Sequence, residues 1–406
     1  MSQARRADVA YCTGLIFGLI FVFIGGPLAR RLEMVHFNDF SGVWSGPSTY
    51  VLGISPWDPA RYSDVAVSLG TKTPDALVYD HMPWTMFAVL PFALVPLEVA
   101  GWIWMLLGMT AAVIALRALL RTFMPGIALA HGALALALFV GQPGFHAVVL
   151  GQWSLLLMAG VAATVLALRA SRPLLGAVTS LVMLFKPQVF VFTALGLAYG
   201  GVRRVTFRRW MLYAGVIVAV VVAVSWTVVS LTVGGDWLSA WLADIPGRRT
   251  LRSAVLQSAL NELIGPIGRW VAALLILGGA VLASRFTPGS DASLAAWLSL
   301  SSAGAIYSWS YDQVLLFVPI VITAGLLARR SRRSGVMFAV AWAGVFLIVS
   351  PILYAIGVAR HDETFSCIVP DAAFLSIVAL LWRRRHEEEA ESVPSPMPLE
   401  RAASAA

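Results

Sequence analysis

The sequence predicts an all-α polytopic membrane protein with about twelve transmembrane helices. Of its 406 residues, 59% are hydrophobic and 12% are charged, whereas a soluble domain has about 25% charged residues. The mean hydropathy is +0.81, and long apolar runs alternate with short arginine clusters along the chain. Helices are the expected elements of such runs, because a helix satisfies its own backbone hydrogen bonds in lipid.

The apolar runs are expected to form these helices in order. They lie at residues 9–29, 84–97, 98–121, 125–142, 148–169, 174–186, 188–202, 210–233, 266–284, 291–307, 312–328, 336–357 and 367–383. Arg5 and Arg6 precede the first run, which is too long for a signal peptide and has no small-residue cleavage site after it. We therefore expect a retained anchor whose N-terminus lies inside the cell. Several later runs are shorter than the ~20 residues that cross a bilayer squarely, and short, proline-broken helices are typical of an intramembrane cavity.

Arginine placement distinguishes two arrangements of these runs. In the first, run 84–97 is re-entrant or incomplete, and about twelve spans leave both termini and every arginine cluster in the cytoplasm. In the second, run 84–97 is a full span, residues 174–202 form one span, and Arg117 to Arg172 lie outside. Because arginines are retained on the cytoplasmic side, we favour the first arrangement. The clusters are Arg117/Arg121, Arg169/Arg172, Arg203 to Arg209, Arg285, Arg329 to Arg333 and Arg383 to Arg385.

The favoured arrangement collects the polar segments on the outer, periplasmic face of the plasma (inner) membrane. These segments are residues 30–83, 141–152, 185–188, 234–265, 307–313 and 359–365. The first is about fifty residues long, too long for a simple connector, so we expect it to contain short interfacial helices. Residues 1–385 are predicted to form one domain. Residues 386–406 are acidic and then rich in Pro, Ser and Ala, which predicts a disordered cytoplasmic tail.

The basic balance of the chain does not indicate nucleic-acid binding. The net charge is +8, but the basic residues lie in short clusters between apolar runs, as in cytoplasmic loops that are attracted to anionic membrane lipid. Cys12 and Cys367 lie in apolar stretches and indicate neither a metal site nor a disulfide framework. No Asp-x-Asp pair is present, so we expect no metal and no other cofactor.

Two aspartates of the first outer segment are candidates for chemistry. In "LGISPWDPARY", Asp58 lies between Pro56 and Pro59, so a turn residue is the simpler interpretation and a catalytic carboxylate is the alternative. Asp39 lies near the membrane surface, either as a helix cap beside Ser41 or as a substrate-facing group.

Five further outer residues are candidates for binding substrate. Tyr62 lies in the same segment as the aspartates, and His81 precedes a proline that could equally begin a helix. Gln152 lies at an outer junction of two runs. Anchoring at the membrane interface explains Trp309 but not Asp312, which lies between two apolar runs.

Lys186 is the most informative charged residue at membrane depth. It interrupts "LVMLFKPQVFVF", and a lysine between apolar half-helices is costly unless it is paired or functional. Pro187 frees backbone groups there, and Gln188 adds an amide. The alternative is that Lys186 only reaches the interface from a helix end. A cation at a broken helix suits an anionic phosphate, which favours a functional interpretation.

Several motifs together resemble a known family. They are "NDF" (38–40), "GISPWDP" (53–59), "YDHMPWTMFAVLPFALVP" (79–96), "GQWSLLLMAG" (151–160), "FKPQVFVF" (185–192), "VLQSALNELIG" (255–265) and "YSWSYDQVLLFVP" (307–319). Over residues of about 10 to 385, the chain resembles the polyprenol-phosphate-mannose-dependent α-(1→2)-mannosyltransferases of the GT-C class, in particular the mycobacterial branch of phosphatidylinositol mannoside synthesis. Ser55 and Trp57 depart from the family's common pattern but leave the carboxylate position intact. Tyr311 and Asp312 stand where many members have histidines, which leaves the role of residues 307–313 open.

This resemblance implies a GT-C fold and an inverting transfer without a covalent intermediate. In such enzymes an aspartate of the first outer loop acts as general base, and Asp58 is the matching position. Lys186 is then the cation that stabilises the leaving lipid phosphate, with His81 and Gln188 as weaker candidates. The resemblance further implies polyprenyl-phosphate mannose as donor and a phosphatidylinositol mannoside as acceptor, and it does not involve a metal.

Two other functions share some of these sequence features. A transporter or lipid flippase would also have broken helices and charges at membrane depth, but the chain shows no repeated halves. A non-catalytic membrane scaffold would leave Lys186 without a role. The enzyme is the hypothesis that we favour.

Overall fold

The computed structural model describes residues 1–31, 38–71, 78–248, 253–360 and 362–391, and every regular element in them is helical. The helices are α1 (Gln3–Arg31), α2 (Asn38–Val51), α3 (Tyr62–Ser68), α4 (Pro83–Val89), η1 (Leu90–Leu94), α5 (Leu97–Phe123), α6 (Ala128–Val140), α7 (Gln142–Leu150), α8 (Ser154–Arg169), α9 (Pro173–Ser180), η2 (Leu181–Phe185), α10 (Pro187–Gly200), α11 (Val205–Val233), α12 (Trp237–Arg248), α13 (Leu256–Ile264), η3 (Gly265–Ile267), α14 (Gly268–Ser284), α15 (Asp291–Ala303), η4 (Ser310–Leu316), α16 (Phe317–Arg330), α17 (Arg332–Gly344), η5 (Val345–Val349), α18 (Ser350–Arg360), η6 (Thr364–Cys367) and α19 (Ile368–Glu391). The predicted all-α membrane class is confirmed.

The membrane-length helices are fewer than the apolar runs. Within the described residues, seven helices are long and apolar enough to cross a membrane, or eight if the bent pair α6–α7 is one span. The expected count of about twelve includes runs that the structure breaks into short pieces, because prolines and polar residues interrupt them. The shorter apolar helices are Pro83–Leu94, Ser154–Arg169, Pro173–Phe185 and Pro187–Gly200.

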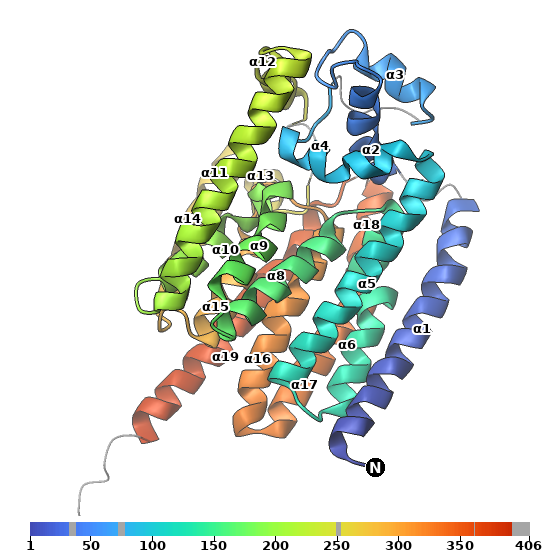
Figure 1. Ribbon diagram of the computed structural model, residues 1–406. Coiled ribbons are helices and arrows are strands. Elements are labelled where there is room, and N and C mark those ends of the chain that lie inside the picture. Colours follow the sequence, from blue (N-terminus) through green and yellow to red (C-terminus); the bar gives the residue numbers. More distant parts are fainter. Residues whose placement is uncertain (32–37, 72–77, 249–252, 361, 392–406) are drawn as a thin grey trace, which may run out of the picture.

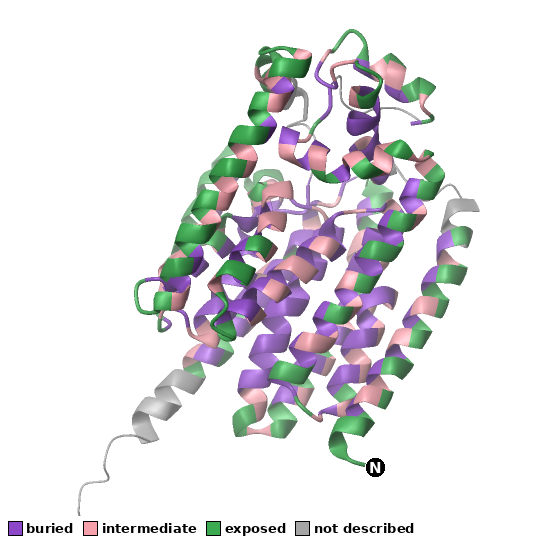
Figure 2. Cartoon of the chain, viewed as in Figure 1, coloured by how far each residue is buried: buried purple, intermediate pink, exposed green. Residues whose placement is uncertain are grey.

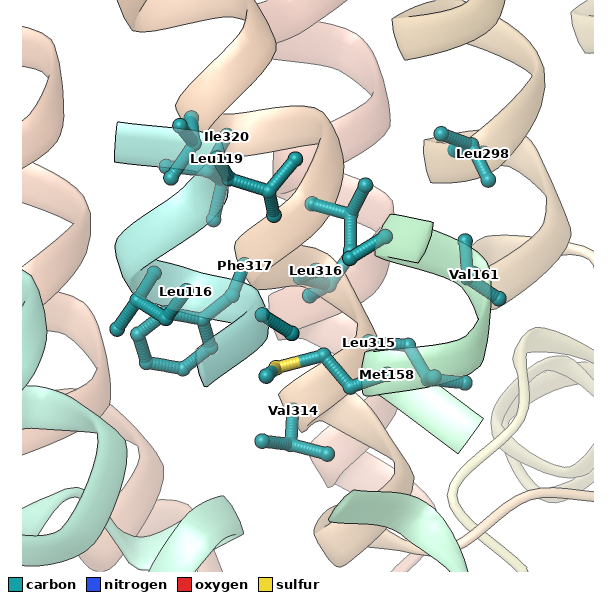
Figure 3. Close-up of a cluster of buried hydrophobic side chains, with 14 of the residues drawn as sticks. Leu116, Leu119, Met158, Val161, Leu298, Val314, Leu315, Leu316, Phe317 and Ile320 are labelled. Carbon is teal, nitrogen blue, oxygen red and sulfur yellow. The ribbon is translucent and has the colours of Figure 1, made fainter. Parts of the chain in front are cut away.

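The core of the bundle lies around η4 and α16. The span Ser310–Arg330 is 89% buried within the molecule, whereas Val205–Val233 is only 11% buried and presents its apolar side chains outward (Figure 2). Figure 3 shows that side chains of η4 and α16 meet Leu116 and Leu119 of α5, Met158 of α8 and Leu298 of α15. The element η4 also carries Asp312, one of the candidate site residues.

The arginines near the N-terminal half lie at the same end of the bundle as the N-terminus. Asp8 in α1 accepts a hydrogen bond of 2.9 Å from Arg121, and Arg117 lies 3.5 Å from the same carboxylate. Arg332 donates to the carbonyl of Gly126 at 3.0 Å and to Oε1 of Gln3, the first residue of α1, at 3.5 Å. The structure therefore agrees with the favoured arrangement and contradicts the one that places Arg117 and the N-terminus on opposite sides.

The first outer segment forms short helices at the opposite end of the bundle, as predicted. Figure 1 shows α2, α3 and α4 there, beside the end of α11 and α12. Trp57 packs on Trp237 with ring centroids 5.3 Å apart, and Trp237 packs on Trp226 at 4.7 Å. The elements α4 and η1 together cover only Pro83–Leu94, too short to cross a bilayer, which agrees with an incomplete span at 84–97.

The C-terminal boundary differs from the predicted one. Residues 386–391 were expected to belong to a disordered tail, but they continue the backbone of α19 through Glu391. Glutamate and alanine, which make up five of these six residues, are strong helix formers, and they outweigh the low hydrophobicity on which the expectation rested. The rest of that tail, residues 392–406, lies outside the described residues.

Candidate active site

Breaks in three helical regions meet at the end of the bundle that α2 and α4 cover. The α7 helix ends at Gly151, whose φ of +70° is the left-handed conformation that favours glycine. A Cβ at that position would also lie 2.6 Å from the Cβ of Phe40. Lys186 follows η2 and caps α10, with Pro187 in the first turn, and Trp309 precedes η4. Each break turns polar side chains inward at membrane depth.

Lys186 contacts residues from the other two helix breaks. Its Nζ donates to Oδ1 of Asp312 at 2.9 Å and to Oε1 of Gln152 at 3.2 Å. The same Nζ lies 4.6 Å from the ring centroid of Tyr311, a cation–π contact. The lysine side chain is 12% exposed and that of Asp312 is 2% exposed. Lys186 is thus one half of a buried ion pair, and its ammonium is hydrogen-bonded to a carboxylate and to an amide of the protein.

Asp312 is held in place from both of its carboxylate oxygens. Ser154 donates to Oδ1 at 2.5 Å, and the backbone N–H of Trp309 donates to Oδ2 at 3.3 Å. The second bond caps the start of η4. Anchored in this way, Asp312 is a fixed negative charge that orients the longer and more flexible lysine.

Gln152 connects this pair to the first outer segment. While its Oε1 accepts from Lys186, its Nε2 donates to Oδ2 of Asp39 in the first turn of α2. A single amide therefore joins a carboxylate to the buried ammonium. The three residues lie 113 and 34 positions apart in sequence, and only the folded bundle brings them together.

Buried tyrosine and glutamate side chains line the same space. Burial raises the pKa of Tyr307 to about 12, and the charges of Asp80, Asp312 and Asp39 add to this rise. The hydroxyl of Tyr307 accepts from Nε1 of Trp309 at 2.8 Å. Burial also raises the pKa of Glu363, with Asp312 and Asp39 adding to the effect. Tyr307 and Glu363 therefore lie in the same polar region as Asp39, Asp312 and the Lys186 ammonium that contacts Asp312.

His81 lies at the edge of this region. Its Nδ1 contacts Oδ1 of Asp80, its ring stacks on Tyr79 at 5.3 Å, and it lies 6.2 Å from the ring of Trp153. Because Trp153 directly follows Gln152, this neighbourhood places the histidine beside the Lys186 cluster.

Three of the predicted site residues have other surroundings. Oδ1 of Asp58 accepts from the backbone of Ala60 at 3.0 Å, and its carbonyl accepts from Tyr62 at 2.9 Å, which are the contacts of a turn. Tyr62 is buried, with its hydroxyl 2.7 Å from that of Ser45. The carbonyl of Gln188 accepts from Ile306 at 3.5 Å. Among the described residues, no hydrogen bond or ion pair joins Asp58 to Lys186, and its catalytic role stays a prediction.

The sequence-based selection missed four residues of the cluster, namely Ser154, Tyr307, Tyr311 and Glu363. Ser154 lies in the motif "GQWS", two positions after the selected Gln152, and its uncharged hydroxyl gives no signal in a pattern of charges. Glu363 lies in the outer segment 359–365, and its Oε2 accepts from the backbone of Ser310 at 2.8 Å. Within the described residues, no group of three or more His, Cys, Asp or Glu side chains could hold a metal ion.

Comparison with known families identifies the class of enzyme. The family model of glycosyltransferase family 87 matches residues 81–351, about two thirds of the chain. The chain belongs to this family. Comparisons with curated proteins and with solved structures find no match. As a member of family 87, the protein is a membrane glycosyltransferase, and the matched residues include Gln152, Lys186 and Asp312 but neither Asp39 nor Asp58.

Proposed function

We propose that this family 87 glycosyltransferase transfers mannose from polyprenyl-phosphate mannose to a phosphatidylinositol mannoside. The transfer forms an α-(1→2) linkage on the periplasmic side of the plasma (inner) membrane. The motif resemblance supports the donor, the acceptor and the linkage. The observation that carries the mechanism is the connected set Asp39–Gln152–Lys186, in which a carboxylate lies one amide away from a buried cation.

The buried ammonium suits the leaving group of such a reaction. When the bond between the sugar's anomeric carbon and the phosphate oxygen breaks, the electron pair stays on the phosphate. A preorganised cation in a site of low dielectric stabilises that developing charge far more than the same cation would in water. Lys186 lies at the break between η2 and α10, where its ammonium would meet the phosphate of a lipid-linked donor.

A carboxylate of the first outer segment completes the reaction as general base. It takes the proton of the acceptor hydroxyl while the oxygen attacks the anomeric carbon from the face opposite the phosphate. One base and no covalent intermediate then give inversion, from a β-linked donor to an α-linked product.

Two aspartates compete for the role of base. The family resemblance favours Asp58, whose observed contacts are those of a turn. The geometry favours Asp39, because Gln152 joins it to Lys186 and its charge acts on Tyr307 and Glu363 of the same region. We propose Asp39 as the base, with Asp58 as the assignment to be tested against it.

A lipid flippase is the alternative function for such a bundle. Broken helices and a buried ion pair suit a transport path as well. Membership of a glycosyltransferase family favours the enzyme. The two functions differ in one product, because only the enzyme makes a new glycosidic bond.

The transfer reaction itself tests the proposal. Purified protein is incubated with polyprenyl-phosphate mannose and phosphatidylinositol mannosides, and the products are analysed by mass and by linkage. We expect an acceptor heavier by one hexose with an α-(1→2) bond, at a rate that a metal chelator leaves unchanged. Transfer from a different polyprenyl-linked sugar alone would overturn the mannose assignment. Lipid movement without any glycosidic product would favour the flippase.

A further inference from the structure

A second polar cavity lies at the opposite end of the bundle from Lys186. It has a volume of about 600 Å³ and is lined by Arg169, Arg204, Phe286, Thr287, Ser290, Asp291, Ala292, Leu326, Arg329 and Leu381. Helix α8 extends from the Lys186 cluster to this cavity, because Ser154 at its start contacts Asp312 and Arg169 in its last turn contacts Asp291. At ~1.5 Å per residue, the two sites are roughly 20 Å apart. The proposed glycosyl transfer does not use this cavity.

The charges of the cavity are unbalanced. Arg169 and Arg329 both form ion pairs with Oδ2 of Asp291, and the Arg329 contact is 3.3 Å long. One carboxylate therefore pairs with two guanidinium groups. Arg204 is exposed on the cavity, and the described residues place no hydrogen-bond acceptor or carboxylate on its guanidinium. Three cations therefore face one anion. An anionic ligand would restore the balance, and arginine suits the oxygens of a phosphate because its planar fork can bind two at once.

Gly289 leaves room for the stem of Arg204. The glycine has a φ of +73°, and a Cβ at this position would lie 2.9 Å from Cδ of Arg204. The left-handed turn before α15 therefore lets the arginine chain lie against the backbone. This contact directs Arg204 along the cavity wall rather than away from the molecule.

The cavity lies at the depth of lipid headgroups. Four of the membrane-length helices begin or end at its margin, namely Val205–Val233, Leu256–Ser284, Ser310–Arg330 and Thr364–Arg383. Apolar side chains next to Arg204 face outward, with Val202 69% exposed and Val205 53% exposed. A ligand in the cavity would thus have its charge among arginines and its chains against a lipid-facing surface.

We propose that this cavity binds the phosphate group of an anionic membrane phospholipid. The ligand is a phosphodiester with acyl chains, and its phosphate lies between Arg204 and the pair Arg169–Arg329. Asp291 competes with the ligand for the two arginines that it contacts. Basic pockets between the ends of membrane helices are suited to such headgroups.

Lipid retention measured by native mass spectrometry of the full-length protein tests this site. Phosphatidylglycerol and phosphatidylcholine with the same chains are titrated into the wild type, Arg204→Gln, Asp291→Asn and the control Arg209→Gln. Arg209 has the same charge and lies in the first turns of α11, which Arg204 precedes, but it does not line the cavity. We expect preferential retention of phosphatidylglycerol, about fivefold weaker in Arg204→Gln, since one basic residue near the membrane surface contributes roughly that factor.

Arg204→Gln and Asp291→Asn should change the affinity for phosphatidylglycerol in opposite directions. Asp291→Asn removes the competing carboxylate and should strengthen phosphatidylglycerol binding, provided that its thermal midpoint shows a folded protein. Arg209→Gln should match the wild type. Equal retention by Arg204→Gln and the wild type would overturn the proposal. Displacement of the lipid by glycerol phosphate at the lipid's own affinity would assign the cavity to a free phosphate instead.

Discussion

Lys186 and Asp312 form a buried pair in which each charge depends on the other. Their side chains are 12% and 2% exposed and their charged atoms lie 2.9 Å apart. Removing one member of such a pair leaves the other charge buried without compensation, at a cost of about 3–5 kcal/mol. A single substitution at either position therefore changes folding and substrate binding together.

Lys186→Ala is expected to lose both stability and donor use, for different reasons. Stability should fall by about 3 kcal/mol because Asp312 is left unpaired. Donor use should fall because the lipid phosphate loses its cation. Lys186→Arg should restore only part of it, since the planar guanidinium differs in shape from an ammonium. Thermal unfolding and donor kinetics measure the two effects.

The double variant Lys186→Ala/Asp312→Asn is the matched control for that prediction. It removes both charges, so stability should return while donor use stays low. Wild-type donor kinetics in the double variant would show that Lys186 only balances the charge of Asp312 and does not act on the donor phosphate.

Asp312→Asn alone should strengthen the binding of the leaving lipid phosphate. A phosphomonoester product carries up to two negative charges, against one on the donor phosphodiester. Asp312 competes with both for the Lys186 ammonium. Without that competition we expect product inhibition by polyprenyl phosphate to become at least roughly tenfold stronger, the scale of one close charge pair in a partly buried site. Unchanged inhibition in a folded Asp312→Asn variant would remove Asp312 from the phosphate site.

Sequence reasoning found the charges of the site but not their pairing. Lys186 is visible because a lysine within an apolar run is rare and costly. Its partner Asp312 lies 126 positions further along the chain, and nothing local in either segment specifies the contact. Asp58 is conspicuous in the sequence because prolines flank it, and its turn contacts are those that its neighbours favour locally, while its catalytic role stays a prediction.

Helical elements were predictable here because apolar runs are the primary signal of helices in lipid. The helix breaks that shape the site were harder to predict from the sequence. Pro187 marks one of them directly, whereas the end of α7 depends on Gly151 and its close approach to Phe40. That second cause belongs to packing between distant elements and cannot be read from local composition.

The contact between η4 and η6 should make stability depend on pH. Glu363 accepts from Ser310 at 2.8 Å, and burial raises its pKa above the ordinary value of 4.5. The folded protein therefore holds this proton more tightly than the unfolded chain does. The resulting stabilisation is complete below pH 4.5 and is lost as the pH rises through the folded-state pKa.

Glu363→Gln tests that expectation directly. The amide is uncharged at every pH, so the variant's thermal midpoint should fall less than that of the wild type as the pH increases from 4.5. The same pH dependence in both proteins would show that Glu363 does not titrate differently on folding.

At the scale of the molecule, the two ends of the bundle differ in charge and in role. Arg117, Arg121 and Arg332 lie at the end that holds the N-terminus, and the Lys186 cluster lies near the end that α2 and α4 cover. Positive charge near membrane helices is retained in the cytoplasm. The candidate active site should therefore open toward the periplasm.

Reporter fusions can test this orientation. Fusions after Arg121, Arg209 and Arg333 should all read cytoplasmic, and one in the segment near Asp58 should read periplasmic. Opposite readings after Arg121 and Arg333 would contradict the common arginine end that the contacts of Asp8 and Arg332 define.

In the proposed mechanism, a carboxylate joined to Lys186 through Gln152 activates the acceptor. The most direct test of this step is the mannose-transfer rate of two isosteric variants, Asp39→Asn and Asp58→Asn, in protein that is folded and still binds the lipid donor. An asparagine retains the size and the turn preference of aspartate but cannot take the acceptor's proton. We predict a loss on the order of a hundredfold or more in Asp39→Asn, and a rate within a few-fold of wild type in Asp58→Asn. A near-normal rate in Asp39→Asn together with a comparable loss in Asp58→Asn would contradict this account and return the base to Asp58.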